Sequence, residues 1–293
     1  MLTTLGKEIG TRIGVEEGSD QKKAEIIAIT SGKGGVGKSS LSVNFAIMLQ
    51  QMRKRVLIID ADIHLGNVDL ILGIRTEYTI ADVLNDGIAL SDIIVPGPSN
   101  IDVLPASSAS GKLLEMEDVF LKRLAVAFKT IETDYDYIIV DTGAGIANSV
   151  LSFLLGADKI VLVITSDPAS IADAYAVIKI IKRNDLDIPI MLIPNIMPSH
   201  EAGENLYKRL NLMVRRFLKS DIEFAGTVLK DDLIARSIKM QKPFVINSPN
   251  AAATNTIRVL TKRVLQMEKK KQKDNKNVFD RFISNRKIKF EWD

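Results

Sequence analysis

Short apolar runs rich in β-branched residues recur along the chain and are separated by longer amphipathic segments. Among these runs are "EIIAIT" (25–30), "RVLIID" (55–60), "YIIVD" (137–141), "KIVLVIT" (159–165), "IPIMLIP" (188–194) and "FAGTVL" (224–229). Nearly continuous apolar runs of this length are typical of strands that are buried on both faces of a parallel sheet. The pattern therefore predicts strands of one mostly parallel sheet.

The segments between the runs show helical periodicity, most clearly over residues 38–51, 117–131, 170–183 and 203–219. Alternating strands and helices predict an α/β fold, in which a doubly wound, mostly parallel sheet carries helices on both faces. We interpret residues 24–265 as one domain, preceded by an N-terminal arm at residues 1–23. A tail at residues 266–293 contains the charged stretch "KKKQKDNKN", which is too polar to form a core.

The composition narrows the range of partners. Of the 293 residues, 46% are hydrophobic, and the net charge of +3 is too small for a general nucleic-acid binder. The sequence has no cysteine, which excludes disulfides and cysteine-ligated metal clusters. It also has neither a signal-peptide pattern nor an apolar run of about eighteen residues. We therefore expect a cytoplasmic protein whose contact with the membrane is peripheral.

A glycine-rich loop lies between the first predicted strand and the first predicted helix. Residues 32–39 read G-K-G-G-V-G-K-S, which fits the phosphate-binding pattern G-x-x-x-x-G-K-[S/T] in its strand-to-helix setting. In such a loop the backbone N–H groups surround a phosphate, Lys38 neutralises the β- and γ-phosphates, and the Ser39 hydroxyl binds Mg²⁺. A glycine-rich turn that binds nothing is the alternative. The predicted nucleotide contacts are Gly32, Lys33, Gly34, Gly35, Val36, Gly37, Lys38, Ser39 and Ser40.

Two further predicted strands end in carboxylates. Asp141 closes "YIIVD", and Asp60 and Asp62 close "RVLIIDAD". Ligands of open α/β sheets collect at the carboxyl ends of the strands, so we expect Asp141 to hold the metal through water and Asp60 to support the metal shell. Asp62 is predicted to orient the attacking water, because phosphoryl transfer depends mainly on placement and charge neutralisation. A helix cap is the alternative role for Asp141.

The same loop carries a second lysine, Lys33, near its start. The glycines on either side leave its side chain free to point away from the phosphate of its own subunit. One interpretation is that Lys33 reaches the nucleotide of a second subunit, so that ATP bridges a dimer. The other is a solvent-exposed lysine without a partner, and the motif chemistry alone does not decide between them. Together with Lys38 and Asp62, Lys33 completes the set of candidate catalytic residues.

The loop and the stretch that ends the second predicted strand resemble a known family. "KGGVGKS" together with "DADIHLGNVDLILG" is similar to the deviant Walker A ATPases of the MinD/ParA family, and the resemblance covers roughly residues 24–265. It implies a P-loop NTPase fold of the SIMIBI type and a homodimer that encloses ATP and Mg²⁺, with slow hydrolysis acting as a timer. In this family the early lysine crosses the dimer interface. The matching positions are Lys33, Lys38, Ser39, Asp60, Asp62 and Asp141.

Within that family the chain resembles the FlhG branch, also called FleN or YlxH, whose members regulate the number and placement of bacterial flagella. The stretches that carry this likeness are "DTGAGIANSVLSFLLGAD" and "TSDPASIADAYAVIKII", where Asp167 replaces the usual glutamate. Asn195 matches the asparagine that contacts adenine, and Asp231 or Asp232 takes the position of an aspartate in the loop that closes over the base. The absence of cysteine separates the chain from nitrogenase iron proteins and Mrp-type cluster carriers.

The beginning of the chain departs from this resemblance. The FlhG branch commonly opens with a D-Q-A-x-x-L-R helix that activates the GTPase FlhF. Here "SDQKKAEIIAI" places Asp20 and Gln21 directly before the first strand and lacks the Leu and Arg. We therefore do not expect activation through such a helix, and an activating arm in residues 1–14 is the alternative.

The tail carries a membrane-binding pattern over part of its length. MinD-like proteins end in an amphipathic helix that lies in the membrane surface. Val278, Phe279, Phe282 and Ile283 fall on one helical face after a lysine-rich stretch, a combination that favours anionic lipid. "RKIKFEWD", in contrast, alternates apolar and charged residues, which a helix does not favour. We expect peripheral association with the inner face of the cell membrane; a disordered tail or one that docks on protein are the alternatives.

Three functions fit these observations. The first is a nucleotide-switched flagellar regulator, whose expected partners are a second copy of the chain, an FlhF-type GTPase, components of the flagellar basal body and C-ring, and an anionic membrane surface. The second is a ParA-like ATPase that partitions DNA or other cargo, for which the domain lacks a strong basic excess. The third is a scaffold that binds ATP without turnover, which the complete set of expected hydrolysis residues disfavours.

Overall fold

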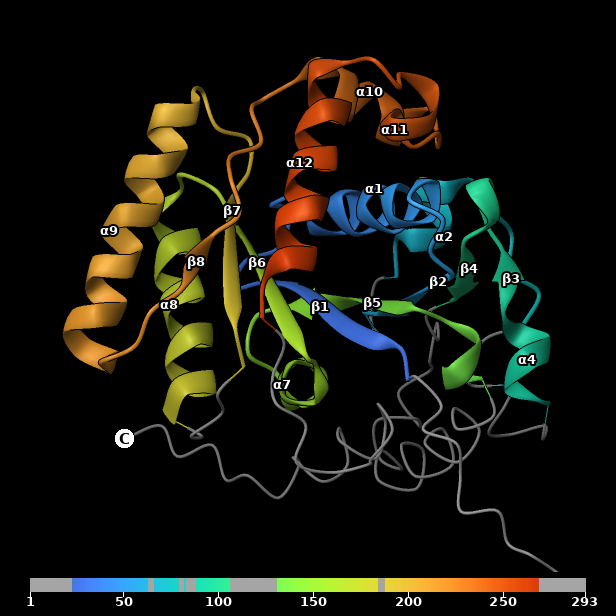
Figure 1. Ribbon diagram of the computed structural model, residues 1–293, viewed down its shortest axis with the longest axis horizontal. Coiled ribbons are helices and arrows are strands. Elements are labelled where there is room, and N and C mark those ends of the chain that lie inside the picture. The colour runs from blue at the N-terminus through green and yellow to red at the C-terminus, as the bar shows by residue number, and fades with distance from the viewer. Residues whose placement is uncertain are drawn as a thin grey trace, which may run out of the picture.

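An eight-stranded sheet runs through the centre of the computed structural model, which describes residues 23–62, 66–78, 82, 88–105, 131–183 and 188–268 (Figure 1). Its strands lie in the order β3-β4-β2-β5-β1-β6-β7-β8. Neighbouring strands are parallel except β3 and β4, which pair in the antiparallel sense at one edge. The bounds are β1 Glu25–Ser31, β2 Val56–Ala61, β3 Val95–Pro96, β4 Asp102–Leu104, β5 Tyr137–Ala144, β6 Lys159–Ile164, β7 Ile190–Pro194 and β8 Glu223–Phe224.

Helices cover both faces of the sheet, and Figure 1 shows α1 on one side of it and α7 on the other. The buried apolar side chains of α1, α2, α11 and α12 belong to one core, and those of α4, α7, α8 and α9 belong to the other. This arrangement confirms the predicted doubly wound α/β fold. The bounds are α1 Lys38–Gln51, α2 Val68–Leu72, α4 Leu90–Ile93, α7 Asn148–Gly156, α8 Pro168–Arg183, α9 His200–Leu218, α10 Asp232–Lys239, α11 Phe244–Asn247 and α12 Ala252–Gln266, with 3₁₀ turns at Pro98–Asn100 and Glu132–Asp134.

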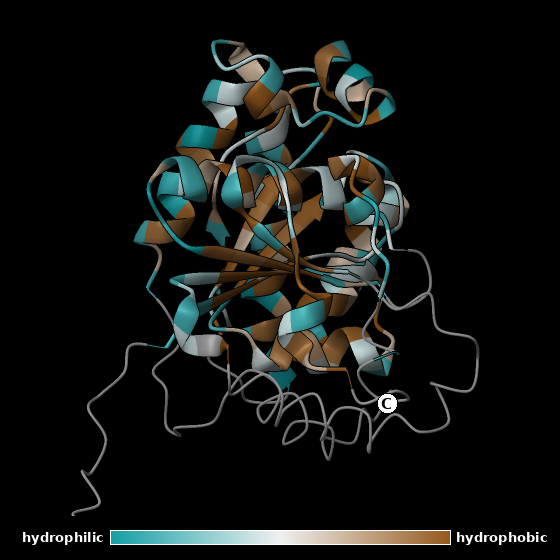
Figure 2. Ribbon diagram, turned by 90° about the vertical axis from the view of Figure 1, so that its right-hand side faces the viewer, coloured by the Kyte–Doolittle hydropathy of each residue, from teal (hydrophilic) through white to brown (hydrophobic). Residues whose placement is uncertain are grey.

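The central strand β1 illustrates why the apolar runs are nearly continuous. Ile26 and Ala28 belong to the core on the α7 side, whereas Ile27 and Ile29 belong to the core on the α1 side. All four side chains are buried, because successive residues of a strand point to opposite faces of the sheet. Figure 2 shows the strands as an apolar band between the two helical layers. A strand in this position has no solvated face and therefore needs no polar alternation.

The predicted strands at 25–30, 55–60, 137–141, 159–165 and 188–194 are confirmed as β1, β2, β5, β6 and β7, and α1 has the predicted bounds. Two helices begin earlier than predicted. α8 begins at Pro168, since proline fits the first turn of a helix. α9 begins at His200, because the Ser199 hydroxyl caps it by accepting a hydrogen bond of 3.1 Å from the Ala202 N–H. Of the predicted helix at 117–131, residues 117–130 lie outside the described residues and Ile131 lies in a turn.

The predicted strand at 224–229 is wrong for most of its length. β8 covers only Glu223–Phe224, and Leu229 takes part in an isolated bridge outside the named strands. Between them the chain passes Gly226 at φ +134°, where a β-carbon would lie 2.8 Å from Leu260 Cδ2. The run is apolar because Ala225 and Val228 pack into the core that α12 covers, and single backbone hydrogen bonds, from Ala225 to Leu192 and from Val228 to Pro194, continue its contact with β7.

Candidate functional site

The glycine-rich loop leads from the end of β1 into the start of α1. Gly37 precedes the helix in a left-handed conformation (φ 86°, ψ 17°), which glycine adopts without strain. A β-carbon at Gly37 would also lie 2.5 Å from Nδ2 of Asn195. The first turn of α1 has no side-chain cap and no acidic residue. Its free N–H groups and the positive end of its dipole are therefore left for an anionic ligand.

Lys38, the first residue of α1, contacts the carboxylate of Asp141 on β5. Lys38 Nζ lies 3.2 Å from Asp141 Oδ1, and both side chains are almost fully buried. Ser42, one turn further along α1, donates a hydrogen bond of 2.7 Å to the same oxygen. Among the described residues, Asp141 Oδ2 is buried without a hydrogen-bond partner. An unsatisfied buried carboxylate oxygen is costly, and a hydrated cation would satisfy it.

Asp60 and Asp141 stand in register on the neighbouring parallel strands β2 and β5. Burial, and after it the negative charge of Asp141, raise the pKa of Asp60 from 3.8 to about 7, although hydrogen bonds from three backbone N–H groups act in the opposite direction. The charge of Asp141 therefore disfavours a second negative charge on Asp60, and positive charge placed between the two carboxylates relieves the repulsion. The pair therefore marks a position suited to a cation.

Asp60 also holds the chain that follows β2. Its Oδ1 accepts a hydrogen bond from the Asp62 N–H (3.1 Å), and its Oδ2 accepts from the N–H groups of Asn67 (2.9 Å) and Val68 (3.1 Å). These bonds fix Asp62 and the start of α2 relative to the sheet. The Asp62 carboxylate lies beside Gly143 of β5, where a β-carbon would be 3.7 Å from Asp62 Cγ. A β-carbon at position 143 would be in ordinary van der Waals contact with this carboxylate, which places Asp62 next to β5.

Lys33 makes its contact at the N-terminal end of α8. Its Nζ forms an ion pair with Oδ2 of Asp167, and the two side chains are 43% and 41% exposed. The pairing is the main reason that the pKa of Asp167 lies below its usual range. The interpretation of Lys33 as a lysine without a partner is therefore wrong for the single chain. Lys33 and Lys38 contact different carboxylates, so the two lysines of the loop have different partners within the single chain.

Asn195, directly after β7, links that strand to the glycine-rich loop. Its Nδ2 donates a hydrogen bond of 2.7 Å to the carbonyl oxygen of Val36. Its backbone N–H donates to the carbonyl oxygen of Ile164 at 2.7 Å, which anchors the residue to β6. The side chain is 5% exposed. Asn195 therefore supports the loop directly, a role that the sequence comparison with adenine-contacting residues did not include.

The segment before α10 lies beside Asn195. Two hydrogen bonds join it to Met197, whose N–H donates to the Val228 carbonyl (3.1 Å) and whose carbonyl accepts from the Lys230 N–H (2.9 Å). Asp231 then caps α10 by accepting a hydrogen bond of 2.8 Å from the Leu233 N–H. Of the two candidate aspartates, Asp231 is half-buried and Asp232 is exposed.

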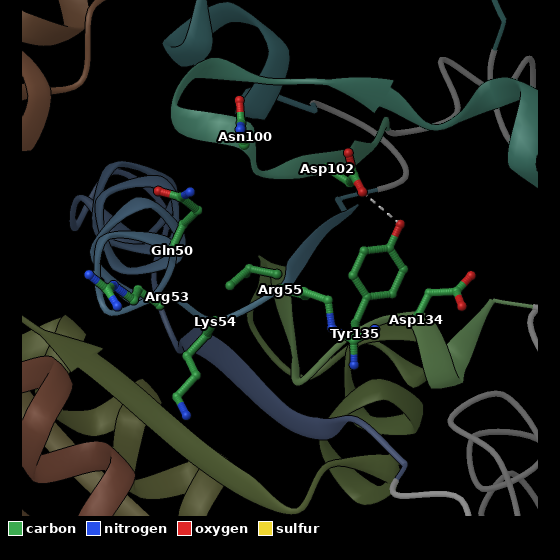
Figure 3. A pocket seen from close by; sticks show the side chains of 9 residues that line it. Gln50, Arg53, Lys54, Arg55, Asn100, Asp102, Asp134 and Tyr135 are labelled. Atoms are coloured by element: carbon green, nitrogen blue, oxygen red, sulfur yellow. Dashed lines mark hydrogen bonds between the residues drawn. The ribbon is translucent and has the colours of Figure 1, made fainter.

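A cavity of about 550 Å³ lies where β2 and β4 begin, at the other end of these strands from the candidate site (Figure 3). Tyr135 donates a hydrogen bond of 2.9 Å to Asp102 there, and burial together with that carboxylate raises the pKa of Tyr135 above its usual range. Val56 at the cavity begins β2, whereas Asp60 lies about 13 Å further along the same strand. The cavity is therefore separate from the glycine-rich loop. It is lined by Gln50, Arg53, Lys54, Arg55, Val56, Asn100, Asp102, Asp134 and Tyr135.

Comparison with known proteins places this loop and these carboxylates in a family. A family model described as an AAA domain matches residues 24–189. The antiactivator FleN of Pseudomonas aeruginosa is 33% identical over 240 residues, which cover 82% of this chain and 86% of FleN. The flagellum site-determining protein YlxH of Helicobacter pylori is 34% identical over 234 residues, which cover 80% of this chain and 79% of YlxH. The chain belongs to the MinD/ParA family of P-loop ATPases.

A solved member of the family has the same fold. The septum site-determining protein MinD of Pyrococcus horikoshii, complexed with Mg-ADP, superposes with a TM-score of 0.68 at 24% identity, covering 82% of this chain and 96% of that one. As a family member the chain is an ATPase, and its nucleotide and metal are ATP and Mg²⁺. None of the helices in the described part of the chain is both long and apolar enough to cross a membrane.

The described residues fit Mg²⁺ held jointly with a nucleotide. They contain no group of three or more His, Cys, Asp or Glu side chains that could hold a metal ion by themselves. Mg²⁺ is typically bound by one or two carboxylates, water and phosphate oxygens, and the unpaired Asp141 Oδ2 is a suitable acceptor for its water shell. The Ser40 hydroxyl is likewise buried without a partner in the described structure. A P-loop ATPase that acquires its metal with its nucleotide is expected to have such a site.

The fold gathers several of the predicted residues at the carboxyl-terminal edge of the sheet, namely Lys38, Ser39, Asp60, Asp62 and Asp141. Sequence reasoning missed Ser42 and the contact of Asp167 with Lys33. The signal for Ser42 is its spacing of four residues from Lys38, which puts both on one helical face. Outside the described residues lie Asp20, Gln21 and the predicted membrane-binding residues Val278, Phe279, Phe282 and Ile283.

Proposed function

We propose that this chain is an ATP-dependent dimerising switch that regulates the number or placement of bacterial flagella. The supporting observation is the buried Lys38–Asp141 pair with its one unsatisfied carboxylate oxygen, at the start of an uncapped helix. This arrangement suits a triphosphate bound together with a cation, as the P-loop requires. The flagellar assignment rests on the likeness to FleN and YlxH. The ATPase domain spans residues 24–265, with the arm and the tail on either side.

At the phosphates, each side chain has one role. The N–H groups of the loop from Gly32 to Gly37 surround the β-phosphate, and Lys38 leaves Asp141 to contact the β- and γ-phosphate oxygens. With Mg²⁺ bound, the Ser39 hydroxyl would be its direct protein ligand, and Asp60 and Asp141 would hold its water shell. Bound Mg²⁺ supplies positive charge that stabilises the transferred phosphoryl group. The Ser40 hydroxyl, which is buried without a partner in the described part of the chain, would donate a hydrogen bond to the α-phosphate.

Hydrolysis depends on placement of the water nucleophile. Asp62 accepts a hydrogen bond from a water in line with the γ-phosphorus; the water oxygen bonds to phosphorus as the bond to the β,γ-bridging oxygen breaks, which releases ADP and phosphate. The backbone bond from Asp62 to Asp60 keeps this carboxylate at the edge of the sheet. The position of the Asp62 carboxylate next to Gly143, two residues after Asp141 on β5, supports the assignment.

The adenine is held on the side of the loop where Asn195 lies. Asn195 contacts the base with its side-chain oxygen Oδ1, since its side-chain nitrogen Nδ2 already donates a hydrogen bond to the carbonyl oxygen of Val36. Asp231 or Asp232, at the start of α10, closes over the base. The hydrogen bonds of Met197 to Val228 and Lys230 support this placement, because they bring the two segments together.

Two copies of the chain associate face to face when ATP is bound, and Lys33 of each reaches the triphosphate of the other. The 43% exposure of the Lys33 side chain supports this role. Hydrolysis removes the γ-phosphate and with it the contact that favours the dimer. Slow hydrolysis therefore limits the lifetime of the assembled state.

The dimer acts at the cytoplasmic face of the cell membrane. Its partners are components of the flagellar basal body and C-ring and an FlhF-type GTPase. The tail residues Val278, Phe279, Phe282 and Ile283 bind anionic lipid weakly in one subunit. Two tails in a dimer bind together, so that dimerisation controls attachment.

Four proteins test the switch in solution: the wild type, Lys33→Ala, Lys38→Ala and Asp62→Ala. Light scattering after size exclusion, with ATP or ADP, measures their mass, and phosphate release measures turnover. We expect Lys38→Ala to lose nucleotide binding, Lys33→Ala to bind ATP as a monomer, and Asp62→Ala to form a dimer that does not turn over. Normal turnover by Asp62→Ala, or an ATP-dependent dimer of Lys33→Ala, would contradict the corresponding role.

Cells and vesicles test the biological assignment. In a flagellated bacterium where this chain replaces the native relative, Asp62→Ala should change the number or position of flagella seen by electron microscopy. Flotation with vesicles of anionic lipid should retain the ATP-bound protein, and Phe279→Ala with Phe282→Ala should abolish retention without changing turnover in solution. Retention on nonspecific DNA instead of vesicles would favour partitioning of DNA, and wild-type flagella in the Asp62→Ala cells would contradict the flagellar role.

A further inference from the structure

Asp167 has two separate hydrogen-bonding duties at the start of α8. Its Oδ1 accepts a hydrogen bond of 2.9 Å from the Ala169 N–H, which caps the helix. Its Oδ2 receives the ammonium group of Lys33. The cap fixes the carboxylate relative to α8, so the lysine side chain is held at a defined place on the surface of its own subunit.

The backbone of the loop is docked on the same helix. Gly32 lies so close to α8 that a β-carbon would be 2.4 Å from the carbonyl carbon of Asp173. The Ser31 hydroxyl donates a hydrogen bond of 2.9 Å to the carbonyl oxygen of Lys33. The base of the Lys33 side chain is therefore fixed, and its exposed end is the part that can change partners.

We propose that Asp167 is a positioning residue that keeps Lys33 within its own subunit until a second subunit offers a triphosphate. The side chains of Lys33 and Asp167 are exposed to about the same extent. Little rearrangement is therefore needed for the Lys33 ammonium group to exchange the carboxylate for a phosphate. The exchange is opposed because Asp167 holds the lysine and also leaves a negative charge near the incoming triphosphate. Asp167 thus raises the protein concentration that ATP-dependent dimerisation requires.

This inference rests on the proposed role of Lys33 at the dimer interface, and it adds a residue that opposes that role. Asp167→Asn is the informative substitution, because asparagine caps a helix as well as aspartate does but carries no charge. Asp173→Asn is the matched control. It removes the same charge from the same helix, close to the same loop, from a residue outside the ion pair.

The test measures the mass of the full chain against its concentration, with the slowly hydrolysed analogue AMPPNP and Mg²⁺. An exposed ion pair contributes little, and two are exchanged per dimer, so Asp167→Asn should lower the midpoint concentration for dimerisation by about 2-fold to 30-fold relative to Asp173→Asn. Asp167→Glu, which retains the charge, should stay closer to the wild type. A shift of less than twofold, or a weaker dimer in Asp167→Asn, overturns the proposal.

Two further measurements separate this proposal from the function it rests on. Carboxyl NMR of the nucleotide-free chain should show the pKa of Asp167 rising when Lys33 is replaced by alanine; an unchanged pKa overturns the ion pair and the proposal with it. If Lys33→Ala still dimerises with AMPPNP, the crossing lysine itself is wrong. If Lys33→Ala fails to dimerise while Asp167→Asn behaves like Asp173→Asn, only the role of Asp167 is wrong.

Discussion

Asp60 stands beside Asp141 on the adjacent strand, and the two carboxylates are stabilised by different means. Asp141 is paired with Lys38 at 3.2 Å, whereas Asp60 accepts hydrogen bonds from the backbone N–H groups of Asp62, Asn67 and Val68. In the nucleotide-free chain the negative charge of Asp141 therefore opposes a negative charge on Asp60.

The charge on Asp60 should make the nucleotide-free protein less stable as the pH rises. Its pKa is about 7 in the folded chain against 3.8 ordinarily, so the folded state binds the proton more tightly than the unfolded state does. The stabilising effect of that proton is complete below about pH 4 and is lost by about pH 7, an order-of-magnitude change of about 4 kcal/mol in the free energy of unfolding.

Asp60→Asn should remove this dependence. Urea unfolding of both proteins from pH 4 to pH 8 measures it, because titrations common to both cancel in the difference. The variant should gain stability relative to the wild type across this interval. A difference that is flat with pH would show that Asp60 ionises normally.

The Lys38–Asp141 pair should respond unequally to loss of its two members. Lys38→Met leaves Asp141 buried beside Asp60 without its cation, and should lower the free energy of unfolding by about 3–5 kcal/mol. Asp141→Asn also breaks the pair, but it removes the repulsion on Asp60 and should cost less. Urea unfolding without nucleotide measures both. Equal losses would mean that the repulsion between the carboxylates is negligible in the folded chain.

The contact between the loop and α8 predicts different tolerance at two glycines of one motif. Gly32→Ala forces a methyl group to within 2.4 Å of the Asp173 backbone, whereas a β-carbon at Gly34 meets nothing within 4 Å. Gly32→Ala should therefore lower the thermal midpoint by several degrees, since overpacking costs about 1–3 kcal/mol. Gly34→Ala serves as the control and should leave the midpoint within about a degree. Calorimetry without nucleotide decides, and equal midpoints would refute the close docking.

A buried lysine at the amino-terminal end of β6 should contribute strongly to stability. Lys159, at the start of β6, lies 2.8 Å from Glu25 and donates hydrogen bonds to the last carbonyls of α12 at Val264 (3.0 Å) and Leu265 (3.2 Å). Lys159→Met leaves Glu25 and these carbonyls without that partner, and should cost about 3 kcal/mol in urea unfolding. Lys208→Met, which breaks an exposed pair with Glu204, should cost less than about 1 kcal/mol.

Several parts of the fold follow directly from the order of residues. The run at 25–30 can only be buried on both faces, and the helix at 38–51 begins where Gly37 ends the loop and Lys38 starts a regular turn. Such elements can be predicted from the local sequence, because each is specified by a contiguous pattern of residues. Helices α7 and α12 and the short strands β3 and β4 were not among the predicted elements. The two short strands depend on contacts with their neighbours more than on their own pattern, whereas α12 buries Ile257, Leu260 and Val264 at helical spacing, a periodicity that is present in the sequence.

The sequence by itself determined the phosphate-binding loop, the carboxylates that end two of the predicted strands, and the doubly wound fold class. These features depend on short motifs and on the period of the hydrophobic residues. Only the tertiary structure decided which carboxylate each lysine meets. Lys33 and Lys38 are five positions apart, yet their partners Asp167 and Asp141 come from different elements. Parallel pairing brings β5 beside β1 and places α8 against the loop, and such long-range pairing leaves no mark on the local pattern of residues.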